Sequence, residues 1–81
     1  MNLNFDELQV DLHGCDSLEA TAIVLNALKE LEEDEYHFSY TFIAGNGSGA
    51  IKFLVEDILD KEGYKYTYLN KNKSIIKAFK K

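Results

Sequence analysis

The chain has 81 residues, of which 46% are hydrophobic, and a formal net charge of −5. These values predict one small folded domain over residues 1–81 and exclude an intrinsically disordered segment. The single cysteine excludes an intramolecular disulfide and a cysteine-based metal framework. Because no apolar run approaches the roughly 20 residues of a membrane helix and no signal-peptide pattern is present, we expect a cytoplasmic protein with no membrane partner.

The charge is divided unevenly along the chain. Residues 1–60 hold two lysines and thirteen acidic residues, a net charge of −11, whereas residues 61–81 hold seven lysines and one acidic residue, a net charge of +6. All nine basic residues are lysine, which predicts contacts with a phosphate backbone rather than with bases. Lys71 and Lys73 are candidates for such contacts, the alternative being a basic segment that only aids solubility.

Residues 8–13 alternate apolar and polar side chains, which predicts a half-buried strand that ends at Gly14. Asp11 and His13 lie on its polar face. A histidine that acts as acid or base, held by a neighbouring carboxylate, suits phosphodiester cleavage. The alternatives are a strand-end histidine bonded to backbone and an isolated surface carboxylate.

Asp16 and Glu19 have the spacing of a capping box and predict the start of a helix. The apolar stripe that follows has helical spacing. Its members are Ala20, Ile23, Val24, Ala27, Leu28 and Leu31. We expect the acidic segment, residues 30–35, to be a solvated loop.

Residues 38–43 predict a second strand, and a second helix begins near residue 51. Between them lies the glycine loop, residues 45–49. Residues 64–69 and 74–79 predict a closing hairpin. The order βαβαββ predicts an α/β fold, specifically a two-layer α+β sandwich with parallel first strands and both helices on one face of a four-stranded mixed sheet.

The glycine loop joins a strand to a helix, where backbone N–H groups and the helix dipole favour an anion. The spacing matches neither the P-loop nor the dinucleotide-binding fingerprint, and an ordinary tight turn is the alternative. Carboxyl ends of neighbouring parallel strands meet at one edge of a sheet, so we expect Asp11 and His13 to converge with this loop. The candidate phosphate-binding residues are Gly14, Gly45, Asn46, Gly47, Ser48, Gly49 and Lys52.

Two of these stretches resemble motifs of the Smr (small MutS-related) domain family. Residues 10–14, Val-Asp-Leu-His-Gly, resemble the family's Leu-Asp-Leu-His-Gly motif. Residues 44–47, Ala-Gly-Asn-Gly, resemble its Thr/His-Gly-x-Gly motif, with Lys52 where arginine is usual. The resemblance spans about residues 8–79, which leaves residues 1–7 as an N-terminal extension. It implies a fold like that of the C-terminal domain of bacterial translation initiation factor three, with sheet order 1-2-4-3.

Many Smr domains nick DNA or cleave RNA, including messenger RNA on stalled ribosomes, and the resemblance implies Asp11 and His13 as the catalytic residues. The chain departs from the family at Ala44 and Asn46 and has Asn-Lys-Asn-Lys at residues 70–73 where a glycine-rich turn is common. Three functions therefore stay open: an Smr-type endonuclease, a non-catalytic module that binds RNA or ribosomes, and a protein-interaction domain. We expect no bound cofactor and leave a requirement for a divalent metal such as Mg²⁺ open. The sequence does not fix the oligomeric state.

Overall fold

A computed structural model describes residues 7–45, 47 and 49–81. Residues 1–6 of the expected N-terminal extension, and Asn46 and Ser48 of the glycine loop, lie outside the described residues. Within the described part, the elements follow the predicted βαβαββ order. They are β1 (Gln9–Asp11), α1 (Ser17–Glu33), β2 (Ser39–Ile43), α2 (Ala50–Glu62), β3 (Lys65–Tyr68) and β4 (Ile75–Phe79).

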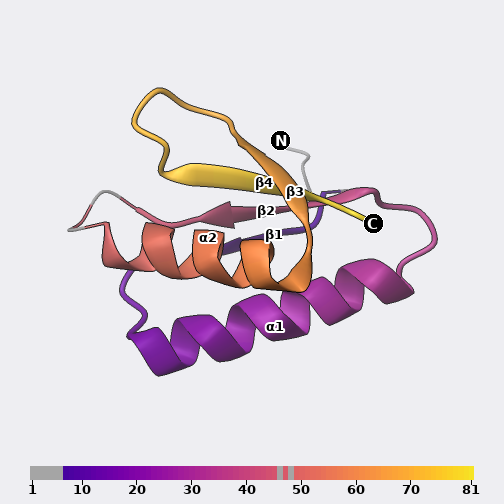
Figure 1. The fold of residues 1–81 in the computed structure, drawn as a ribbon, viewed down its shortest axis with the longest axis horizontal. Helices are drawn as coiled ribbons and strands as arrows, with labels where there is room; N and C mark the ends of the chain where they lie inside the picture. Colours follow the sequence, from indigo (N-terminus) through magenta and orange to yellow (C-terminus); the bar gives the residue numbers. More distant parts are fainter. Residues whose placement is uncertain (1–6, 46, 48) are drawn as a thin grey trace, which may run out of the picture.

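The strands form a mixed sheet in the order β1-β2-β4-β3, which confirms the predicted fold class. β1 pairs with β2 in parallel, with Asp11 opposite Ile43. β4 is antiparallel to both β2 and β3. Both helices lie on one face of this sheet and pack against each other (Figure 1). Within residues 7–45, 47 and 49–81, the other face of the sheet carries no helix.

The start of α1 agrees with the sequence, but its end does not. Asp16 accepts a hydrogen bond from the backbone N–H of Glu19 at 2.8 Å, and the Glu19 carboxylate accepts one from the backbone N–H of Asp16 at 3.0 Å. This is the expected capping box. The prediction of a solvated loop over residues 30–35 was wrong for its first four residues, because α1 continues to Glu33. The buried stripe extends to Leu31 and holds this last turn on the core, which outweighs the repulsion among the acids.

The core lies between the helices and one face of the sheet. In β2, Tyr40 and Phe42 point toward the helices, and in β4, Ile76 and Ala78 do the same. Phe42 is fully buried, and truncating such a side chain to alanine costs about 3–5 kcal/mol. The helices add Ala20, Val24, Ala27, Leu28, Leu31, Val55, Ile58 and Leu59. None of the described helices is long and apolar enough to cross a membrane.

Three tyrosines in and beside β3 link the sheet to the helices through hydrogen bonds from their hydroxyl groups. They serve the packing of the fold rather than a surface on which bases could stack. The Tyr64 hydroxyl donates a hydrogen bond to Glu32 of α1 at 3.0 Å. Tyr66 donates to a carboxylate of α2 at 3.0 Å, and Tyr68 donates to another. Burial, reinforced by the bond to Glu32, raises the pKa of Tyr64 to about 12. The hydrogen bond to Glu56, followed by burial, raises the pKa of Tyr68 to about 12.

The last two lysines bind the carboxyl ends of the helices. The Lys80 ammonium donates to the backbone carbonyl of Asp34, the C-cap residue of α1. The Lys81 ammonium donates to the carbonyl of Glu62, the last residue of α2, at 2.9 Å. Cations at helix C-termini offset the dipole, and here they also face an acidic segment. These two lysines therefore act as helix caps at the end of the molecule where the chain terminates (Figure 1).

The tyrosine hydrogen bonds predict a loss of stability at high pH. A pKa that is raised on folding stabilises the protein fully below the unfolded value near 10, and this contribution is lost as pH rises toward 12. We expect Tyr64→Phe to lower the free energy of unfolding by about 1 kcal/mol at pH 8 and by progressively less toward pH 12. Urea unfolding across this range measures the effect. Tyr36→Phe is the control, because Tyr36 is 85% exposed, and an equal loss at every pH for Tyr64→Phe would contradict the account.

Candidate functional site

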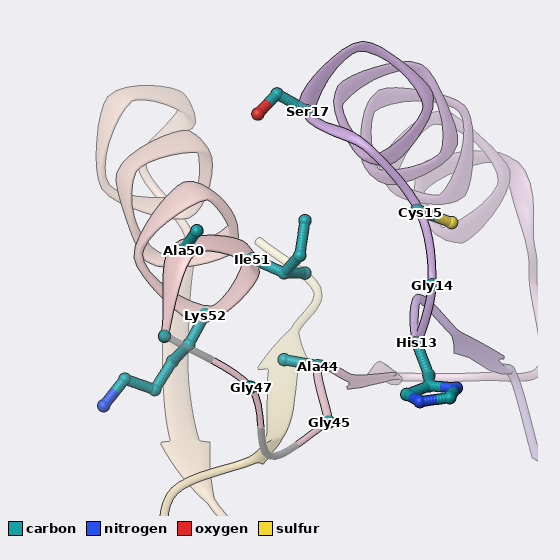
Figure 2. A pocket seen from close by; sticks show the side chains of 11 residues that line it. His13, Gly14, Cys15, Ser17, Ala44, Gly45, Gly47, Ala50, Ile51 and Lys52 are labelled. Carbon is teal, nitrogen blue, oxygen red and sulfur yellow. The ribbon is translucent and has the colours of Figure 1, made fainter.

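An open cleft of about 280 Å³ lies between the N-terminal ends of α1 and α2, where the chain leaves β1 and β2 (Figure 2). It brings both predicted motifs together although about thirty residues separate them in sequence. Its lining is His13, Gly14, Cys15, Ser17, Ala44, Gly45, Gly47, Gly49, Ala50, Ile51 and Lys52.

Parallel pairing places His13 beside the glycine loop. Leu12 donates a backbone hydrogen bond to Ile43 at 2.8 Å, so the residues that follow both strands leave the sheet side by side. Gly45 has φ +81°, and a Cβ added there would lie 3.4 Å from Cδ2 of the His13 ring. The ring is exposed, and in Figure 2 it lies next to Gly45. The His13 ring therefore lies beside the glycine loop and is also accessible to solvent.

Asp11 contacts His13, but through the main chain. Its Oδ1 atom accepts a hydrogen bond from the backbone N–H of His13 at 2.9 Å. The sequence-based expectation was a carboxylate that orients the imidazole ring. In the structure this hydrogen bond fixes the backbone at the end of β1 and thereby the position from which the His13 side chain extends. Asp11 is exposed, and it is absent from the cleft lining among the described residues.

The two helix N-termini at the cleft differ in charge. The N-terminus of α1 is occupied by its capping box, which brings the carboxylates of Asp16 and Glu19. In contrast, the N-cap residue of α2 is Gly49, which has φ +93° and makes no side-chain cap, and the first turn of α2 contains no acidic residue. The first turn of α2 instead carries Lys52. An anion in the cleft is therefore attracted toward α2.

Lys52 lies at the rim of the cleft. Its side chain extends away from His13 in Figure 2. Its ammonium nitrogen is 5.0 Å from the centroid of the Phe53 ring, within the range of a cation–π interaction. Lys52 and His13 are thus on opposite sides of the glycine loop, and a bound group that contacts both must cross the loop.

The turn between β3 and β4 lies next to the glycine loop but outside the cleft. Ala44 donates a backbone hydrogen bond to Ser74 at 2.7 Å, which ties the end of β2 to this turn. Asn70 holds the turn by accepting hydrogen bonds from the backbone N–H groups of Ser74 and Ile75 at 3.0 and 3.1 Å. Lys71 and Lys73 are exposed in this hydrogen-bonded turn, at the same end of the sheet as the cleft, and the Lys73 ammonium lies 5.3 Å from the centroid of the Tyr68 ring.

Comparison with known proteins supports the fold and nothing more detailed. No family model matches the chain, and no curated protein matches it. The solution structure of the SMR domain of NEDD4-binding protein 2 aligns with a TM-score of 0.76 and 19% identity, over 100% of this chain and 93% of that one. The chain has the Smr-domain fold. A crystal structure of the human small-MutS related domain aligns with a TM-score of 0.64 and 20% identity, over 89% of this chain and 99% of that one.

Within the Smr fold, the structure adds a cleft residue that the sequence did not single out. Ser17 is the first residue of α1, and its hydroxyl points over the space between the two helices in Figure 2. The sequence did hold a signal for this residue, because Ser17 directly follows Asp16, the predicted N-cap of the helix that comes after the strand of His13. Cys15 also lines the cleft, but its sulfur points toward α1. Among the described residues, no group of three or more His, Cys, Asp or Glu side chains is arranged to hold a metal ion.

The placement of His13 depends on the left-handed backbone at Gly45, which gives a testable pair of variants. Gly45→Ala should lower the free energy of unfolding by about 1–2 kcal/mol, because alanine disfavours a positive φ. It should also shift the NMR signals of the His13 ring, against which the new methyl packs. Gly47→Ala is the matched control, since nothing apart from its chain neighbours lies within 4 Å of a Cβ added there. Equal destabilisation by both variants would show that the Gly45 conformation does not control this site.

Proposed function

We propose that this Smr-fold chain is a small endonuclease that binds nucleic acid at the cleft and cleaves the phosphodiester backbone, with RNA as the preferred substrate. The observation that carries the proposal is the contact of the exposed His13 ring with the glycine loop at the start of α2. Phosphodiester cleavage needs a base, an acid and stabilisation of charge on the phosphoryl oxygens, and we assign the first two roles to His13 and the third to the glycine loop.

Charge supports binding at this end of the molecule. The first turn of α2 carries Lys52 and no acidic residue, and Lys71 and Lys73 lie in the β3–β4 turn at the same end of the sheet. The acidic segment, residues 30–35, lies at the opposite end of α1. A polyanion is therefore attracted to one end and repelled from the other, even though the net charge of the whole chain is −5.

The chemistry proposed for RNA uses the imidazole of His13. The ring nitrogen takes the proton of the ribose 2′-hydroxyl, and the 2′-oxygen attacks the adjacent phosphorus. The bond from phosphorus to the 5′-oxygen breaks, and that oxygen takes a proton from the imidazolium or from water. The products are a 2′,3′-cyclic phosphate and a 5′-hydroxyl. Backbone N–H groups at the glycine loop stabilise the charge that develops on the phosphoryl oxygens.

RNA is favoured because its own 2′-hydroxyl supplies the nucleophile. DNA nicking requires a water molecule to be positioned and activated, which asks more of the site than one imidazole. Asp11 contributes by fixing the backbone at His13. We propose no resident cofactor, and assays with and without Mg²⁺ test that part of the proposal.

A second candidate is a non-catalytic module that binds RNA or ribosomes. Two geometric observations favour it: the Asp11 carboxylate bonds to the backbone of His13, and Lys52 extends away from the ring. Neither side chain therefore approaches the imidazole as a direct catalytic partner. Binding without cleavage, retained when His13 is changed, would establish this candidate over the nuclease.

His13→Ala tests the proposed nuclease directly. We expect the variant to lose at least about 100-fold in cleavage rate, the usual size of a general acid–base contribution, and to keep nucleic-acid binding within a few-fold. Labelled structured RNA and supercoiled DNA, each with and without Mg²⁺, are the substrates. His37→Ala is the control, because His37 lies at the other end of the sheet, where its ring bonds Asp34 at 3.0 Å. Equal cleavage by wild type and His13→Ala would rule out the proposed role of His13.

A further inference from the structure

Phe53 interrupts the charged outer surface of α2. The exposed positions that follow it on this helix are Asp57, Asp60, Lys61 and Glu62. Phe53 itself is 61% exposed, in the first turn. A single exposed apolar side chain is common and has no meaning by itself. The significance of this one depends on what surrounds the ring.

The ring of Phe53 borders the glycine loop. A Cβ added to Gly49 would lie 3.4 Å from Cε2 and 3.8 Å from Cδ2 of the ring, so the ring edge packs over the residue that opens α2. Gly49 also accepts a backbone hydrogen bond from Phe53 at 2.9 Å. An aromatic surface is thus fixed within one helical turn of the proposed phosphate site.

The charges around the ring suit an anionic ligand. The ammonium of Lys52 lies over one face of the ring, 5.0 Å from its centroid, so a base would stack on the opposite face. Two acids follow Phe53 on the same side of the helix. Asp57 is paired with Lys61 at 3.0 Å, and Glu56 accepts a hydrogen bond from the Tyr68 hydroxyl, which reduces their repulsion of a phosphate. An aromatic face combined with a lysine is the pairing that binds single-stranded nucleic acids, in which bases stack on rings and cations follow the backbone.

We propose that Phe53 is a stacking platform for an unpaired base next to the phosphate held at the glycine loop, so that the site selects single-stranded segments. This inference rests on the proposed function and deepens it. Bases in a duplex are stacked on both neighbours and cannot present a face to the ring, whereas a base in a loop or a single strand can be splayed onto it. Phe53 is therefore a specificity-determining residue, distinct in role from His13.

The test measures binding of a fluorescein-labelled 12-nucleotide single-stranded RNA and of a blunt duplex of the same sequence, both in the His13→Ala background to prevent cleavage. Phe53→Ala should weaken single-strand binding by roughly 5- to 100-fold and leave duplex binding within about 2-fold. Phe38→Ala is the matched control, because Phe38 is 75% exposed and lies at the other end of β2. It should change neither affinity.

Phe53→Trp provides a second readout. The natural chain contains no tryptophan, so this variant has a single indole at the proposed platform. The single strand should quench its emission and bind with wild-type affinity or tighter, whereas the duplex should leave the emission unchanged.

The outcomes separate this inference from the proposed function. If nucleic acid binds but Phe53→Ala changes single-strand and duplex affinity equally, or changes neither, the stacking platform is refuted and the nuclease proposal stands. If the wild-type chain neither binds nor cleaves any nucleic acid, the proposed function fails and this inference fails with it. Thermal unfolding of each variant verifies that the exposed substitution has left the fold intact.

Discussion

The parallel pairing of β1 with β2 is the constraint on which the candidate site depends. Because both strands run in the same direction, His13 and Gly45 leave the sheet at one edge, although thirty-two positions separate them in the chain. An antiparallel pairing would send the two motifs to opposite ends. The pairing also places the N-termini of both helices over that edge, since each helix directly follows one of these strands. Two short motifs thereby become one cleft.

The same topology gives the molecule two ends of different character. At the cleft end, α1 closes its N-terminus with its own carboxylates, while α2 leaves a glycine at the position where a cap would compete with an anion. At the far end, the acidic segment of residues 30–35 is balanced by the C-terminal lysines, which bind the last carbonyls of both helices. The lysines of the chain therefore serve two purposes. Some stabilise helix ends, and others remain on the cleft side, where a polyanion can reach them.

Sequence patterns predicted the architecture correctly where each pattern depends on the chemistry of neighbouring residues. The Asp16 capping box and the alternation of apolar and polar side chains over residues 8–13 are properties of neighbouring residues, and the structure contains both. The end of α1 was missed because burial of Leu31, a tertiary contact, overrides local charge repulsion. The direction in which the Lys52 side chain extends could not be predicted from the sequence either. A flexible side chain turns toward whatever ring or anion lies nearby, and only the folded structure reveals that this neighbour is Phe53.

We propose that nucleic acid binds where the carboxyl ends of β1 and β2 meet. Amide chemical-shift mapping of the ¹⁵N-labelled protein, titrated with a short single-stranded oligonucleotide that lacks 2′-hydroxyls, measures this most directly. We expect the largest shifts at residues 13–17, 45–53 and 71–74, with residues 30–38 unaffected. Shifts centred on residues 30–38, with the glycine loop unchanged, would contradict it.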